Sequence, residues 1–187
     1  MSCKTDQLPR FVSVVALALL VELVISSATV ATGPSLGYPK GRPYYGSERT
    51  SRSVRHARSY ARGIYKYSRD SEKIEPAVAK AESEELGRNI TKAQKDLATV
   101  RNDAGDDAKT LAALKAVEEH LAAAAEHHKM LHEECCKDAV HGDVCMKHCN
   151  EILLELDMAQ AKQDALIRSL EIGAGSTSSA SGTHQHP

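Results

Sequence analysis

Apolar residues recur at three- and four-residue steps in three runs, which cover residues 74–100, 111–135 and 145–170. The sequence "RNDAGDD" at 101–107 separates the first two runs, and "HGD" at 141–143 separates the last two. An apolar residue at every third or fourth position places one stripe along an α-helix, which has about 3.6 residues per turn. We therefore predict three long helices, and their short connections make neighbouring helices antiparallel.

A weaker pattern precedes these runs. Residues 51–69 carry a thin apolar stripe on an otherwise basic segment, formed by Val54, Ala57, Ala61 and Ile64. The predicted fold is an all-α, antiparallel, coiled-coil-like bundle of three long helices. Seams this rich in alanine suit helices that approach closely. A short basic helix over 51–69 is one candidate for a fourth member, and a homodimer is the other way to complete the bundle.

The first 31 residues have the layout of a secretory signal peptide. Lys4 and Arg10 precede an apolar run over 11–25, and small residues follow it. The alternative is an N-terminal membrane anchor, although Glu22 inside the apolar stretch would be costly at the centre of a bilayer. We therefore expect an exported protein, periplasmic or secreted, with a membrane-anchored form as the alternative.

Charge and composition divide the rest of the chain. Residues 32–70 hold all six tyrosines and nine Lys or Arg against two Asp or Glu, and we predict a basic linker there. The bundle domain is expected over 71–172 and a disordered Gly/Ser/His tail over 173–187. The linker either folds back onto the acidic bundle or contacts an anionic surface or polymer. Nucleic acid is the least favoured partner of an exported protein.

The second and third helices meet in a segment rich in sulfur and imidazole. Residues 127–149, "HHKMLHEECCKDAVHGDVCMKHC", contain five histidines and four cysteines. If the two helices fold back about Gly142, residues whose numbers sum to roughly 283 lie opposite each other. Cys135 then faces Cys149, and Cys136 lies near Cys145. These side chains are therefore expected to converge within about two turns of the hairpin tip.

One interpretation of this cluster is purely structural. Signal-peptide cleavage would remove Cys3 and leave four cysteines, an even number, in an oxidising compartment. Two disulfides, Cys135–Cys149 and Cys136–Cys145, would then staple the hairpin of an interaction protein that binds no metal. This alternative explains the cysteines but not the histidines around them.

The other interpretation is a site for a soft metal ion. Thiolate and imidazole ligands suit zinc or copper, and bundles build metal sites from side chains three or four positions apart on facing helices. This interpretation predicts a copper or zinc ion as cofactor and partner. The candidate ligands are Cys135, Cys136, Cys145, Cys149, His132, His148, His128 and His141.

"CMKHC" at 145–149 resembles the Cys-x-x-x-Cys pairs of exported, cysteine-rich four-helix-bundle copper-binding and copper-storage proteins. In that family, paired thiolates inside the bundle hold Cu(I). The resemblance covers the second and third predicted helices. It implies that Cys145 and Cys149 bind copper, with Cys135 and Cys136 as partners across the hairpin. The family lines its whole bundle with cysteines, whereas this chain has four at one end, which implies one or two ions.

Enzyme classes fit the sequence less well. It contains neither the Cys-x-x-Cys-His of covalently bound haem nor the Glu-x-x-His pairs of di-iron bundles. A thiol-redox role for Cys145 beside His148 stays open. We therefore predict a non-enzymatic helical-bundle protein that binds a soft metal ion at one hairpin tip, with the disulfide-stapled interaction protein as the alternative.

Overall fold

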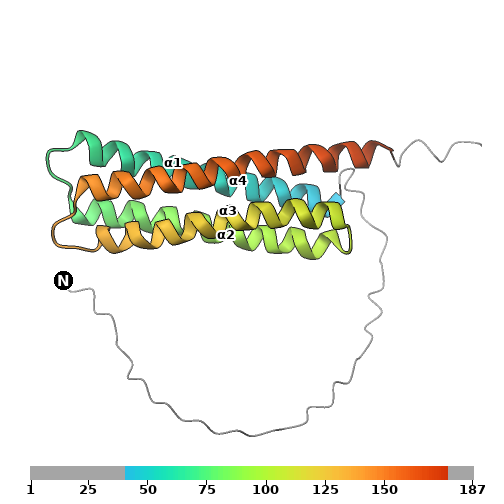
Figure 1. Ribbon diagram of the computed structural model, residues 1–187, viewed down its shortest axis with the longest axis horizontal. Helices are drawn as coiled ribbons and strands as arrows, with labels where there is room; N and C mark the ends of the chain where they lie inside the picture. The colour runs from blue at the N-terminus through green and yellow to red at the C-terminus, as the bar shows by residue number, and fades with distance from the viewer. Residues whose placement is uncertain (1–40, 177–187) are drawn as a thin grey trace, which may run out of the picture. The chain divides into compact units, whose positions relative to one another are not determined.

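The computed structural model describes residues 41–176, which form four α-helices and no β-strand within that range. The helices are α1 (Gly41–Asp70), α2 (Pro76–Ala104), α3 (Ala108–Cys135) and α4 (Gly142–Ser176). The predicted all-α antiparallel bundle is therefore confirmed, and it has four long members (Figure 1).

The four helices form a closed ring around one core. α1 packs against α2 and α4, and α3 packs against the same two helices, while the diagonal pairs lie apart. Helices that follow one another in the chain run in opposite directions (Figure 1). Short connections enforce this up-down-up-down order, because a few residues cannot carry the chain back along a helix more than 40 Å long, given about 1.5 Å of rise per residue.

The fourth helix considered over residues 51–69 is confirmed, and it extends over more of the segment that we named a linker. Residues 41–70 form α1, a helix of 30 residues that is a full member of the bundle. Its first three turns lack an apolar stripe because small polar residues occupy the inward positions. Gly46, Ser47 and Thr50 are buried there, and the Thr50 hydroxyl donates to the Gly46 carbonyl at 3.2 Å. A pattern search for apolar residues therefore misses this face.

Two buried glutamines on α4 complement the small polar residues of α1. Gln163 is fully buried and donates from Nε2 to the Ser47 carbonyl oxygen at 3.0 Å. Gln160 donates from Nε2 to Ser51 Oγ at 2.7 Å. Because a buried amide is costly without a hydrogen-bond partner, these bonds favour one register of α1 on α4.

The remaining core is aliphatic. Its largest fully buried apolar side chains come from all four helices: Val54, Ile64, Leu86, Ile90, Leu97, Leu114, Leu121, Leu131, Ile152, Leu156 and Leu166. Tyrosines of α1 cover this core only at its edge, as partly buried side chains. Burial of these aliphatic groups is the main force that holds the helices together.

The connections over residues 71–75 and 136–141 lie at the same end of the bundle (Figure 1). Gly142 begins α4 there and packs closely against α1. A Cβ atom on Gly142 would lie 2.9 Å from the Ser68 carbonyl oxygen and 3.1 Å from Ile74 Cδ1. The glycine about which the two helices were predicted to fold back is thus a residue of close approach at a helix start, and the turn lies before it.

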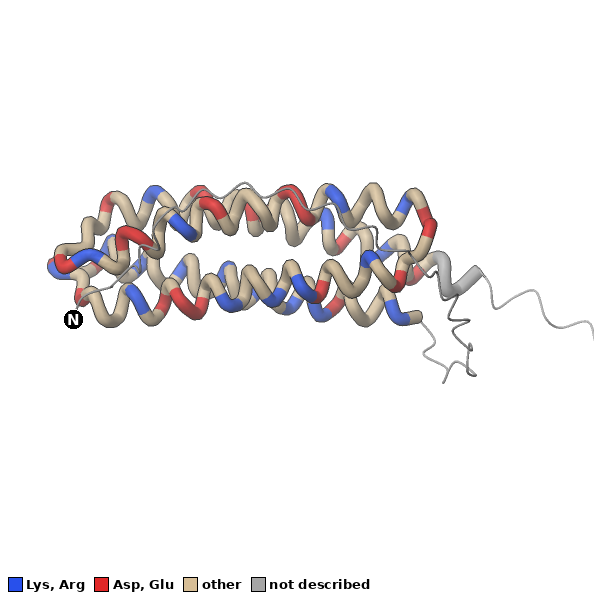
Figure 2. The backbone as a smooth tube through the Cα atoms, turned by 90° about the horizontal axis from the view of Figure 1, so that it is seen from below, with Lys and Arg blue, Asp and Glu red and all other residues tan. Residues whose placement is uncertain are grey.

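The surface is charged along all four helices (Figure 2). Arg49 of α1 pairs with Asp96 of α2 at 3.6 Å, and Arg58 of α1 pairs with Asp157 of α4. Exposed pairs of this kind contribute about 0–1 kcal/mol each, so they guide the packing of basic α1 more than they stabilise it. Contact of this helix with an anionic surface or polymer stays a prediction, as does the homodimer.

The predicted signal peptide, residues 1–31, lies outside the described residues, as do positions 32–40 and 177–187 of the predicted linker and tail. α4 continues to Ser176, past the end predicted for the domain at residue 172. None of the helices within residues 41–176 is apolar enough over a sufficient length to cross a membrane.

Two glycines of α1 provide a matched test of the packing. A Cβ atom on Gly46 would lie 2.6 Å from Val100 Cγ2, whereas one on Gly63 would meet nothing within 4 Å. We expect Gly46→Ala to lower the free energy of unfolding by about 1–3 kcal/mol, because α1 and α2 must separate. Gly63→Ala should raise it by about 0.5–1 kcal/mol through helix propensity. Urea denaturation measures both, and stabilisation by Gly46→Ala would contradict this packing.

Candidate metal centre

The eight candidate ligands do not form one site. The structure separates them into four groups that face different parts of the bundle. Cys135, Cys145 and Cys149 lie in the core, and His128, His132 and Cys136 face α2. His148 lies at the contact between α3 and α4, and His141 lies in the connection between these helices.

The register of the hairpin explains this separation. The predicted pairing assumed a turn centred on Gly142, whereas α3 ends at Cys135 and α4 begins at Gly142. The connection therefore spans residues 136–141, and its centre lies about three residues earlier than predicted. Glu151 therefore meets His127, and Cys145 meets Cys135 rather than Cys136.

One group of three possible ligands does come together, at the contact between α3 and α4. His127 of α3 and His148 and Glu151 of α4 each place a ligand atom within 4.8 Å of the other two. The Nδ1 atoms of both imidazoles lie 3.1 Å from the same carboxylate oxygen, Glu151 Oε2. His148 and Glu151 are three residues apart on one face of α4, and helix packing brings His127 to them.

Only one of the two imidazoles is hydrogen-bonded to this oxygen. The Nδ1 atom of His148 is hydrogen-bonded to Glu151 Oε2. The Nδ1 atom of His127 is buried at the same distance, but it has no hydrogen-bond partner among the described residues. A buried imidazole nitrogen without a hydrogen-bond partner, close to a carboxylate oxygen, is available to bind an ion that the carboxylate also binds.

The two nitrogen–oxygen separations also fit a metal ion of the size of zinc. Zinc binds imidazole nitrogen and carboxylate oxygen at about 2.0–2.2 Å, so two ligand atoms 3.1 Å apart subtend an angle of roughly 100° at the ion. This angle lies between the tetrahedral and octahedral values. The side chains of His127, His148 and Glu151 are 30%, 12% and 33% exposed, so solvent can reach the group and supply further ligands.

A second imidazole–carboxylate pair lies further along the same contact between α3 and α4. His120 of α3 lies two turns before His127, and its Nδ1 atom is 2.8 Å from Glu155 Oε2 of α4. Glu155 itself lies one turn beyond Glu151. This pair has a good hydrogen bond and no third ligand within the described residues, so it serves as an internal comparison for the three-ligand group.

No disulfide joins the four cysteines of the described range to one another, so neither predicted disulfide is present in the structure. The side chains of Cys135 and of Ser68, at the end of α1, lie beside the Cys145 thiol. Their polar groups, Cys135 first, lower the pKa of Cys145, which lies in the first turn of α4, where a helix favours negative charge. The same contact raises the pKa of Cys135, and burial raises that of Cys149 to about 12.

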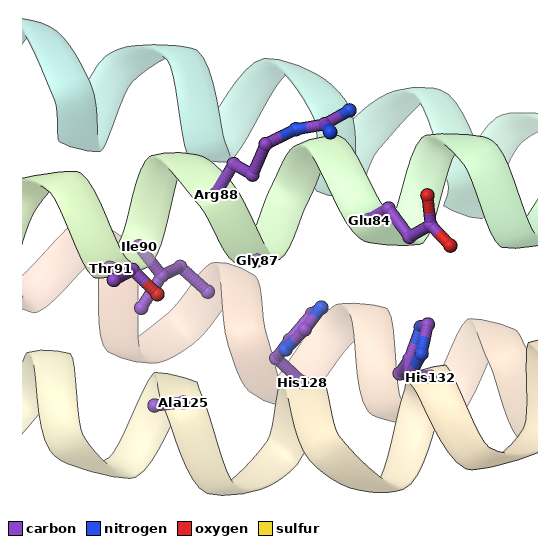
Figure 3. Close-up of a pocket in the computed structure, with 8 residues that line it drawn as sticks. All are labelled: Glu84, Gly87, Arg88, Ile90, Thr91, Ala125, His128 and His132. Carbon is purple, nitrogen blue, oxygen red and sulfur yellow. The ribbon is translucent and has the colours of Figure 1, made fainter.

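The imidazoles that face α2 are fixed by backbone geometry. His128 Nε2 lies 2.8 Å from the Ser83 carbonyl oxygen, and a Cβ atom on Gly87 would lie only 2.4 Å from His128 Cε1. Figure 3 shows His128 and His132 side by side on α3, both directed toward α2. Burial lowers the pKa of His128, and nearby His132 lowers it further. The hydrogen bond to Ser83 occupies Nε2, so His128 is a structural histidine in this arrangement.

His141 holds the connection between α3 and α4 to a buried carboxylate. Glu134 is 3% exposed, and its Oε1 atom accepts from His141 N at 3.0 Å and lies 2.8 Å from His141 Nδ1. Lys137 pairs with the other oxygen. Burial alone would raise the pKa of Glu134, but the hydrogen bonds from Lys137 and His141 outweigh it and hold the pKa at about 2.

No protein-family model, curated protein or solved structure matches this chain. The resemblance to copper-binding bundles therefore stays an expectation, and the function must be argued from the geometry.

Sequence reasoning missed two of the three ligands that the structure brings together, His127 and Glu151. A usable signal was present, because His120 and His127 are seven residues apart on α3, and Glu151 and Glu155 are four apart on α4. Each pair lies on one helix face. These two faces of α3 and α4 can be matched only when the position of the connection between the helices is known.

The pH dependence of stability tests the role of Glu134. Its pKa is about 2 in the folded chain and about 4.5 ordinarily, so its stabilising contribution is complete above pH 4.5 and is lost as the pH falls toward 2. We expect Glu134→Gln to lower the free energy of unfolding at pH 7 by about 2–3 kcal/mol. This difference from the unaltered chain should shrink below pH 4.5.

Urea unfolding between pH 2 and 7 measures this effect. The exposed neighbour Glu133 provides the control, and Glu133→Gln should change stability little at any pH. An equal loss of stability at pH 2.5 and pH 7 in Glu134→Gln would show that the charge of this carboxylate does not hold the connection.

Proposed function

We propose that this protein is a non-enzymatic helical bundle that binds a divalent transition-metal ion, zinc or copper, through His127, His148 and Glu151. The observation that carries the proposal is the convergence of three ligand atoms within 4.8 Å, with one buried imidazole nitrogen left without a hydrogen-bond partner. Their positions on two long helices keep the ligands in place before the ion arrives.

The chemistry of the donor set supports this choice of metal. Two imidazole nitrogens and one carboxylate oxygen are borderline ligands that suit zinc and divalent copper. Calcium and magnesium prefer oxygen ligands alone. The ion would also neutralise the charge of the Glu151 carboxylate, whose Oε2 atom lies 3.1 Å from both Nδ1 atoms.

The thiols of the core form a second candidate site for a metal ion. Cys135 and Cys145 lie beside each other, and Cys149 lies one turn deeper in the bundle. Two thiolates can bind Cu(I), which prefers soft ligands, and this arrangement agrees with the family resemblance. The His/Glu group is the stronger candidate for a divalent ion because it is reachable from solvent, whereas these three thiols are 0–1% exposed.

We also propose that the protein works outside the cytoplasm. This proposal is supported by the amino-terminal sequence alone, whose basic residues, apolar run and small residues have the order of a signal peptide.

Calorimetric titration of the full chain with zinc chloride at pH 7 tests the metal proposal, since zinc does not oxidise thiols. We expect His127→Ala and His148→Ala each to weaken zinc binding about 100-fold or more, because each removes one ligand.

Two variants provide matched controls. His120→Ala removes an imidazole from the same contact between α3 and α4. A double variant, Cys145→Ser with Cys149→Ser, removes two thiols from the core. Both should bind zinc as the unaltered chain does. Unchanged zinc affinity in His127→Ala would contradict the proposal. Loss of zinc from the cysteine variant alone would move the site into the core.

A further inference from the structure

The outward face of α1 carries a row of positive side chains. This helix has no acidic residue between Glu48 and Asp70. Over that stretch, exposed basic residues recur at steps of three, four or seven positions, which places them on one broad face of the helix. This basic row consists of Arg49, Arg52, Arg55, Arg62 and Lys66. At 1.5 Å of rise per residue it spans about 26 Å.

Two acidic side chains beside α1 are already paired. Asp96 of α2 lies 3.6 Å from Arg49 and 3.0 Å from Lys92. Asp157 of α4 pairs with Arg58, which is directed toward α4 and is not part of the basic row. Of the row, only Arg49 takes part in these pairs. The neighbouring helices therefore leave most of its charge uncompensated.

The other members of the row keep their charge available to solvent. Arg52, Arg62 and Lys66 have no ion pair within residues 41–176. Arg55 donates one hydrogen bond, to Ser51 Oγ at 2.9 Å, and its guanidinium has further N–H donors. Like charges on one face repel each other, and a bound polyanion would remove that repulsion.

No large apolar side chain is exposed on α1 between residues 49 and 66. Val54 and Ile64 are 0% and 1% exposed because they lie in the core, and Tyr60 and Tyr65 pack against the edge of that core. A helix that enters the surface of a bilayer needs a free apolar face. Since α1 has none, its outward face is suited to contact by charge and hydrogen bonds.

Small side chains separate the charged members of the row. Ser59 and Gly63 are exposed there, and a Cβ atom on Gly63 would meet nothing within 4 Å. This open space lets a polymer lie close to the helix. The Ser59 hydroxyl can hydrogen-bond to hydroxyl groups of such a polymer.

We propose that the basic row of α1 binds a linear anionic polysaccharide, whose carboxylate or sulfate groups pair with the guanidinium groups. A straight helix presents its charges along a line, which matches an extended chain. Guanidinium groups bind carboxylates and similar oxyanions through two parallel hydrogen bonds. The choice of polysaccharide over nucleic acid rests on the proposed location outside the cytoplasm. It rests also on the row itself, which has no exposed aromatic side chain on which bases could stack.

This inference does not depend on the proposed metal site. None of the metal ligands proposed above lies on α1, and α1 does not pack against α3. Binding measured in the presence of a chelator therefore tests the basic row without testing the metal centre. Zinc titration of the same variants reports on the metal centre alone.

The probe is heparin, a linear polysaccharide that carries sulfate and carboxylate groups. Its binding to the full chain is measured by fluorescence anisotropy of an end-labelled fragment with EDTA present. We expect the triple variant Arg52→Gln, Arg62→Gln, Lys66→Gln to bind heparin about tenfold more weakly, or weaker still, at about 50 mM NaCl. The slope of log affinity against log salt should fall by about 2–3, because fewer counterions leave the polymer.

Three exposed lysines of α3 provide the matched control. The triple variant Lys109→Gln, Lys115→Gln, Lys129→Gln changes the net charge by the same amount, on the helix diagonally opposite α1. It should alter heparin affinity by about twofold at most, since these charges lie far from the row and are screened by salt. Far-ultraviolet circular dichroism checks that both triple variants keep their helices.

Three results would overturn the proposal. The first is no binding of heparin by the unaltered chain, and the second is equal weakening by the two triple variants, which would reduce the effect to net charge. The third is tighter binding of phosphatidylglycerol vesicles or a DNA duplex than of heparin, lost in the α1 variant, which would assign the row to a membrane or to nucleic acid. Unchanged zinc affinity in the α1 variant would leave the proposed metal site standing in each case.

Discussion

The buried carboxylate of Glu134 is the interaction on which the arrangement of the candidate sites depends. It accepts hydrogen bonds from the backbone and side chain of His141 and pairs with Lys137, so it holds both ends of the connection between α3 and α4. The length and shape of this connection set the register of the two helices. That register decides which residues of α3 meet which residues of α4.

The chemistry of the bundle follows from this register. With α4 beginning at Gly142, His127 meets His148 and Glu151, and Cys135 meets Cys145 in the core. A connection centred about three residues later in the chain would instead bring the cysteines together in the pairs that we first expected. The register thereby separates the imidazoles from the thiols. The imidazoles, which are borderline ligands, lie where solvent can reach the contact between α3 and α4, and the thiols, which are soft ligands, lie in the core.

The number of long helices after residue 71 was predictable from the sequence, because leucine, isoleucine and alanine recur there with helical spacing. α1 was only partly predictable. Its inward face begins with Gly46, Ser47 and Thr50, whose burial depends on Gln163 of α4, a residue more than a hundred positions away. The candidate site was predicted in the right hairpin, and His148 was named, but His127 and Glu151 were not. Spacing within a helix fixes a face, whereas contact between helices depends on the connection, and the Gly142 signal misplaced its centre.

X-ray absorption at the zinc edge tests the central claim most directly, because it reports which atoms surround the ion. For the full chain loaded with one equivalent of zinc, the account predicts only nitrogen and oxygen neighbours at about 2.0–2.2 Å. Sulfur neighbours at about 2.3 Å would show that the thiols hold the ion and would contradict the assignment of His127, His148 and Glu151 as its ligands.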